Sequence, residues 1–152
     1  MKIDAKVQSI SKLKDYFFLV PDYQREYVWK PDDEVEQFLI DIENEYSPDA
    51  KEQRNYFLGS IIIVNNDRCF DVVDGQQRLT TIMLSLCVFR DLLKKETLNS
   101  AQKNYLQIIE NLLYNFDIES GETRVRLELQ YEESHDSVSY THLRAHETRR
   151  HL

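Results

Sequence analysis

The chain has 152 residues, of which 41% are hydrophobic, and a formal net charge of −8 at pH 7. This length and apolar content suffice for one domain with a core, whereas two independent domains would each be small. The excess of acidic residues argues against general electrostatic binding to DNA, since non-specific affinity depends on basic side chains that contact phosphates. Any nucleic-acid contact is therefore expected to be local, or to be supplied by another domain.

Targeting and cysteine signals are few. No apolar stretch approaches the roughly 18 residues of a membrane span, and the amino end carries no apolar signal segment. We therefore expect a cytoplasmic protein. Cys69 and Cys87 have no CxxC-type partner, which favours two reduced thiols over a disulfide or a metal site.

The first part of the chain predicts two helices and a strand. Residues 9–14 predict a short helix behind a serine that can cap it, and residues 16–20 predict a strand that stops at a proline. An amphipathic helix then follows Pro31, with acidic residues in its first turn and apolar residues at helical spacing. This helix is expected to close near Pro48.

The remainder predicts three strands and two helices. The apolar run 57–64 predicts a strand buried on both faces, and residues 69–74 return as its hairpin partner. A long helix begins at Gln76, a second covers about 100–116, and residues 124–130 alternate like a strand. The periodic apolar positions of the long helix are Leu79, Ile82, Leu86, Phe89 and Leu93. Together these elements predict an α/β (α+β) domain with a small mixed sheet packed by helices.

The last residues differ from everything before them. Residues 137–152 show neither the helical nor the strand period, and they hold three of the four histidines. They resemble translated adapter read-through, so we expect one domain over residues 1–136, incomplete at its carboxyl end, and a non-native or disordered tail. His142 and His146 are one helical turn apart, but a zinc site needs a structured frame and further ligands.

The sequence DGQQR, Asp74 to Arg78, lies where the strand over 69–74 gives way to the long helix. The helix start offers unpaired backbone donors and a positive dipole end, and Arg78 adds a forked cation. Gln76 and Gln77 occupy the same first turn. These features predict a phosphate site, although a capped helix with a solvated arginine would explain Asp74 and Gly75 equally well.

Other residues of this junction refine the hypothesis. The hydroxyls of Thr80 and Thr81 could line the same phosphate site, while Leu79 turns inward to the core. Asp74 would repel a bare phosphate unless a divalent cation bridges the two, or unless it orients a water or a sugar hydroxyl. Either version favours a nucleotide over a simple anion.

A second cluster is VPDYQREYVWK, Val20 to Lys30. In an extended conformation its apolar rings and one cation share a side, and Gln24 and Glu26 share the other. The members of the first side are Tyr23, Arg25, Tyr27 and Trp29. Such a row could hold a base by stacking, or it could be core.

The motifs PDYQREYVW, LGSIIIV and VVDGQQRLTT, in this order, make residues Ile10 to Tyr131 similar to the amino-terminal domain of the GmrS-type family. That family belongs to the ParB and sulfiredoxin-like superfamily and occurs in modification-dependent restriction and other phage-defence systems. The resemblance implies nucleoside-triphosphate binding and hydrolysis at Asp74, Gly75, Gln76, Gln77 and Arg78. It also implies that Tyr23, Gln24 and Arg25 join the same pocket. Family members continue into an HNH-type nuclease domain, and nothing in this chain resembles it.

Two functions remain open. In the first, the chain is an NTP-hydrolysing regulatory module that gates a nuclease: Asp74 holds Mg²⁺ or the attacking water, Gln76 or Gln77 orients that water, and Arg78 neutralises developing charge. In the second, it is a non-catalytic ParB-like clamp that binds nucleotide or DNA. Cysteine chemistry of the sulfiredoxin kind is opposed, since neither cysteine lies in DGQQR.

Overall fold

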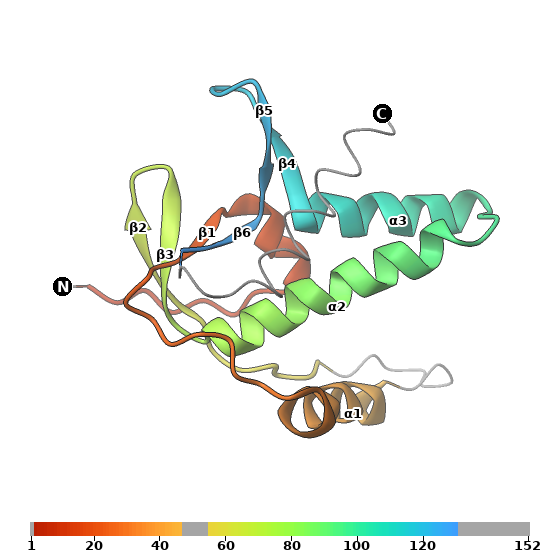
Figure 1. Cartoon of the computed structure of the whole chain (residues 1–152), viewed down its shortest axis with the longest axis horizontal. Coiled ribbons are helices and arrows are strands. Elements are labelled where there is room, and N and C mark those ends of the chain that lie inside the picture. The colour runs from red at the N-terminus through yellow and green to blue at the C-terminus, as the bar shows by residue number, and fades with distance from the viewer. Residues whose placement is uncertain (1, 47–54, 131–152) are drawn as a thin grey trace.

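The structure, a computed structural model, describes residues 2–46 and 55–130. Its centre is a mixed four-stranded sheet in the order β2-β3-β1-β6 (Figure 1). The strands are β1 (Phe18–Val20), β2 (Ile62–Asn66), β3 (Cys69–Asp74) and β6 (Leu127–Leu129). β1 runs parallel to both β3 and β6, whereas β2 is antiparallel to β3. The mixed α/β class predicted from the sequence is confirmed.

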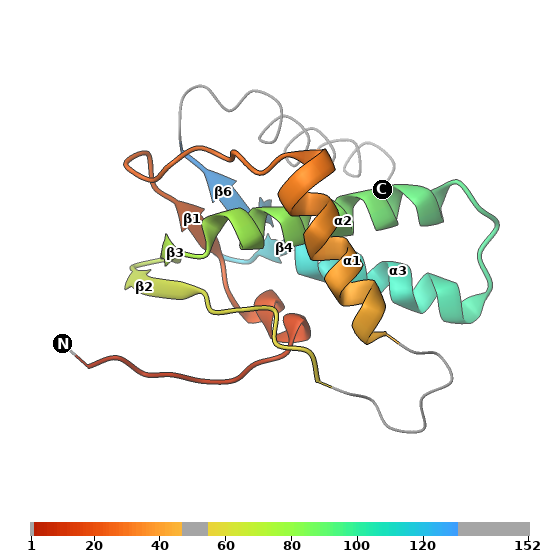
Figure 2. The ribbon, with the colours of Figure 1, turned by 90° about the horizontal axis from the view of Figure 1, so that it is seen from below.

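Three α-helices accompany the sheet: α1 (Glu36–Glu45), α2 (Gln76–Lys94) and α3 (Ser100–Leu113). α2 and α3 pack on each other, and α1 lies on the opposite side of α2 (Figures 1 and 2). The smaller elements are a 3-10 helix, η1 (Ile10–Asp15), a π-helical turn, η2 (Pro31–Val35), and a hairpin of β4 (Tyr114–Asp117) and β5 (Glu122–Val125). Across the described ranges, no helix combines the length and apolar content that a membrane crossing requires.

The core lies between the sheet and the two packed helices. Val20, Val72 and Leu79 are fully buried at its centre, and the cluster also contains Phe18, Met83, Cys87, Leu113, Leu127 and Leu129. Burial of each side chain of this size stabilises the fold by roughly 1.5–3 kcal/mol. The core therefore fixes the end of β3 and the beginning of α2 relative to each other, which positions the DGQQR residues.

The predicted strand over 57–64 is wrong in its extent and in its burial. Pairing begins only at Ile62, and β2 is an edge strand, because nothing in the described chain pairs with its outer side. Ile62 and Val64 are consequently about half exposed. The preceding residues do not join the sheet because Gly59, with φ +116°, turns the chain toward the start of α2.

The predicted strand over 124–130 is two strands in two different sheets. β5 pairs with β4, and β6 pairs with β1, with Arg126 between them. The backbone N–H of Arg126 donates to the carbonyl of Leu113. The helix predicted over 100–116 ends at Leu113. The strand predicted over 16–20 shortens to β1.

The helical predictions need further corrections. Ser9 precedes η1 without a side-chain capping bond, and the helix after Pro31 begins as η2 and closes at Glu45 rather than near Pro48. In α2, Leu79 is buried as predicted, but Phe89 is about half exposed. Ile82 is also buried as predicted, and the buried face of α2 further includes Met83, Cys87 and Arg90. The predictions for residues 137–152 and their histidines lie outside the described residues.

Candidate functional site at the start of α2

The junction between β3 and α2 is built around Gly75. This residue has φ +86° and ψ 14°, and its carbonyl accepts the helical bond from the Leu79 N–H at 2.9 Å. A Cβ at Gly75 would lie 2.8 Å from the Ser60 carbonyl oxygen and 3.2 Å from the Ile61 Cα. Glycine is therefore required twice, for the left-handed conformation and for the close approach of the chain before β2.

No side chain caps the start of α2. Asp74, the last residue of β3, is exposed, so the capped junction weighed from the sequence is wrong in that respect. The first amides of α2 keep the donor capacity that an α-helix leaves unused at its amino end. The positive end of the helix dipole coincides with them.

Arg78 lies against the chain that leads into β2. Its Nη1 donates to the Ser60 carbonyl at 3.1 Å. A Cβ at Gly59 would lie 2.4 Å from the guanidinium carbon, so the guanidinium rests directly on this glycine. The side chain is half-buried and stays beside the helix start instead of extending into solvent.

The two glutamines of DGQQR bind the backbone of residues Arg25–Trp29, here called the strap. Gln77 is 8% exposed; its Nε2 donates to the Glu26 carbonyl at 2.8 Å. Its Oε1 accepts from the Val28 N–H at 2.8 Å and from the Trp29 N–H at 3.4 Å. Gln76 Nε2 donates to the Arg25 carbonyl at 3.0 Å. The YQR and DGQQR motifs are thus joined through side chain and backbone.

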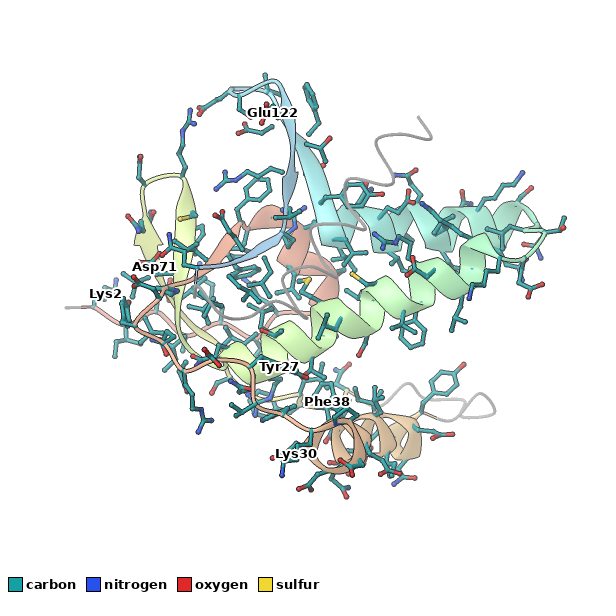
Figure 3. All side chains as sticks on the ribbon, in the orientation of Figure 1. Lys2, Tyr27, Lys30, Phe38, Asp71 and Glu122 are labelled. Carbon is teal, nitrogen blue, oxygen red and sulfur yellow. The ribbon has the colours of Figure 1, made fainter. Side chains whose placement is uncertain are left out.

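The threonines of α2 belong to the same junction but face inward. Thr80 and Thr81 are at most 2% exposed. The Thr81 hydroxyl donates to the Gln77 carbonyl at 2.8 Å and shares a 2.9 Å hydrogen bond with the Tyr27 hydroxyl. Figure 3 shows Tyr27 beside the first half of α2. Neither threonine is brought to the exposed helix start, where the sequence hypothesis put their hydroxyls.

The aromatic row proposed from the sequence is dispersed. Tyr23 lies in a turn, closed by a 3.1 Å bond from the Gln24 N–H to the Pro21 carbonyl, and is 72% exposed. Trp29 packs against Phe38 of α1, with ring centroids 5.9 Å apart. Arg25 is exposed, and only its carbonyl is held by α2.

The acidic side chains at the start of α2 suit a metal ion that is held partly by a bound ligand. Among residues 2–46 and 55–130, no three His, Cys, Asp or Glu side chains gather as a metal site. Asp74 is a single exposed carboxylate at the helix start. Mg²⁺ usually takes one or two carboxylates together with substrate phosphates. The donor set suits Mg²⁺ carried by phosphates, not a preformed all-protein cage.

Cysteine chemistry finds no support at this site. Cys69 is at the far end of β3 from Asp74. Burial, followed by the negative charge of Asp71, raises the pKa of its thiol. A thiol with a raised pKa is a poor nucleophile at neutral pH.

Gly59 and Ser60 are parts of the site that were not predicted from the sequence. A signal was available, because this Gly-Ser pair interrupts an otherwise apolar run. An interruption of this kind in a strand pattern often marks a close backbone approach. Here the approach is to Gly75 and Arg78.

The model of the family described as "GmrSD restriction endonuclease, N-terminal domain" matches residues 7–151. Among curated proteins, no sequence matches this chain.

Proposed function

The chain belongs to the family of GmrSD restriction endonuclease N-terminal domains, and from this premise we propose that it binds and hydrolyses nucleoside triphosphates to regulate a nuclease. Membership makes it part of a restriction system and implies a nuclease domain as its partner. The nucleotide chemistry and the regulatory role are the proposal. They rest on the geometry at the start of α2.

The observation that carries this proposal is the position of Arg78 beside the uncapped first turn of α2. Backbone amides and the helix dipole favour an anion there, and a guanidinium matches phosphate oxygens in a fork. Among the described residues its guanidinium donates to the Ser60 carbonyl through Nη1, and in this arrangement Nε and Nη2 can donate to a ligand. In the proposal, Arg78 neutralises the charge that develops on the transferred phosphoryl group.

Asp74 and the YQR residues complete the proposed site. Asp74 would hold Mg²⁺, which neutralises phosphate charge and can polarise the attacked phosphorus. Alternatively, Asp74 orients the attacking water through its exposed carboxylate. Tyr23, Gln24 and Arg25, in and beside the strap, would contact the base, the ribose or the outer phosphates.

Phosphate release tests the proposal. The 152-residue chain, supplied with GTP or ATP and Mg²⁺, is expected to release inorganic phosphate, and Arg78→Ala is expected to lower kcat by roughly 10²-fold or more. Arg68→Ala is the matched control, because Arg68 is exposed and pairs with Glu119 away from α2. Equal turnover of Arg78→Ala and the wild type would remove Arg78 from the mechanism.

One observation favours a second candidate, a non-catalytic binding module. The side chains of Gln76 and Gln77 hold the backbone of the strap, and the Thr81 hydroxyl shares a hydrogen bond with the Tyr27 hydroxyl, as in a clamp that joins two segments. This candidate predicts saturable nucleotide binding by calorimetry with no phosphate released in a parallel assay. Product formation at the rate of nucleotide consumption would decide for the hydrolase.

A further inference from the structure

We propose that Gln76 and Gln77 are positioning residues that fasten the strap, Arg25–Trp29, to the first turns of α2 and so present Arg25 at the helix start. This inference rests on the proposed function for its nucleotide, but the attachment itself stands on hydrogen bonds. Four bonds from the two glutamine side chains reach residues 25, 26, 28 and 29 of the strap. The bond between Tyr27 and Thr81 adds a fifth link.

The strap needs partners because it belongs to no sheet or helix. Its backbone N–H and C=O groups would otherwise have to be satisfied by water. A carboxamide offers a donor and an acceptor side by side, as a neighbouring strand does. Gln77 uses both for Glu26 and Val28, so the side chain replaces a missing strand at this place.

Burial makes the Gln77 attachment the stronger of the two. Its side chain is nearly inaccessible to water, and its three bonds to the strap are part-buried, so loss of its amide would leave two donors and an acceptor that water can satisfy only in part. The Gln76 bond is exposed, so water can replace it. Oε1 of Gln77 already accepts two bonds, so it could accept from an attacking water only if the strap gave up one of them.

The strap carries its own reporter, because Trp29 is the one tryptophan of the sequence. Trp29 is half-buried against Phe38, and its backbone N–H donates to Gln77 Oε1. Release of the strap would therefore expose the indole to solvent. Its emission would move to longer wavelength, and acrylamide would quench it more strongly.

The first measurement needs no nucleotide. Gln77→Met, which keeps the size but removes both polar atoms, is expected to red-shift Trp29 emission and to increase quenching. Gln76→Met should give a smaller change of the same sign. Gln107→Met on α3 is the control, since its exposed side chain donates to Asn111 of the same helix. Trp29 emission in Gln77→Met identical to that of the control would overturn the proposal.

The second measurement separates positioning from direct chemistry. With GTP or ATP and Mg²⁺, loss of positioning is expected to raise KM about tenfold with kcat little changed. A large fall in kcat with unchanged KM and unchanged Trp29 emission would mean that Gln77 acts on the water, which contradicts the proposal. Gln77→Glu would set a carboxylate oxygen against the Glu26 carbonyl at a nearly buried place, so at neutral pH it is also expected to release the strap.

The two proposals fail in distinguishable ways. If the wild-type chain neither binds nor hydrolyses nucleotide, the proposed function fails, and Trp29 emission alone decides whether the glutamines hold the strap. If circular dichroism shows that Gln77→Met does not fold, Gln76→Met and Thr81→Val replace it. Thr81→Val removes the bond to the Tyr27 hydroxyl. Unchanged emission in both of these variants would overturn the attachment.

Discussion

Arg126 joins three segments of the chain through one guanidinium. It is fully buried, and it donates to the carbonyls of Tyr16 at 2.6 Å, Asn111 at 2.8 Å and Leu112 at 3.3 Å. The last two carbonyls belong to the end of α3, where a cation is favoured by the helix dipole. Burial lowers the pKa of Arg126 to about 10, so the side chain remains charged at neutral pH.

Replacement of Arg126 tests this role. Arg126→Met is expected to lower the free energy of unfolding by roughly 3–5 kcal/mol, because three carbonyls in one buried and two part-buried bonds lose their charged donor. Arg126→Lys should lose part of this free energy of unfolding, since an ammonium cannot reproduce the forked geometry of the guanidinium. Urea denaturation measures the difference. The exposed Arg68 provides the control, and an Arg126→Met midpoint as high as that of Arg68→Met would contradict the prediction.

At the scale of elements, the chain before β2 supports the site from one side and the strap supports it from the other. Gly59 and Ser60 contact Arg78, and Ser60 and Ile61 cover Gly75. The strap is bound by the two glutamines. α2 therefore begins between two irregular segments, and the shape of the candidate site depends on both.

Gly59→Ala is expected to disturb stability and nucleotide binding together. The backbone at φ +116° would be strained by roughly 1–3 kcal/mol. The new methyl group would also displace the guanidinium of Arg78, because the two would be only 2.4 Å apart. Thermal unfolding and nucleotide calorimetry measure the two effects.

Gly121→Ala is the matched control for that variant. Gly121 also has a positive φ, of +70°, but nothing lies within 4 Å of its added Cβ. It should lose about 1 kcal/mol of stability and keep the nucleotide affinity of the wild type. Similar affinity in the two alanine variants would show that Gly59 does not position Arg78.

The features that the sequence predicted correctly depend on neighbouring residues. The end of β3, the turn at Gly75 and the inward side chain of Leu79 follow from glycine conformation and helical period. The edge position of β2 depends on which strands meet in space, and no period in an apolar run encodes that. The glutamine contacts were missed for the same reason, since Gln77 and Val28 are distant in sequence.

At the scale of the whole molecule, the net charge of −8 governs encounters with DNA. The chain is expected to bind an unmodified duplex no more tightly than about 10 μM at 150 mM salt, because non-specific affinity comes from released phosphate counterions. Fluorescence anisotropy with a labelled duplex measures this, with a basic protein of similar size as the positive control. Saturation below 1 μM would show a local basic surface strong enough to outweigh the charge.

The parallel pairing of β1 has a consequence for synthesis on the ribosome. β1 is made before both of its partners in the sheet, Phe70 of β3 and Leu127 of β6, and the second of these follows α1, α2 and α3 in the chain. Contacts between such distant parts of a chain are slow to form. A nascent polypeptide therefore carries an unsatisfied inner strand until β6 emerges, and up to that point it is a natural client of chaperones.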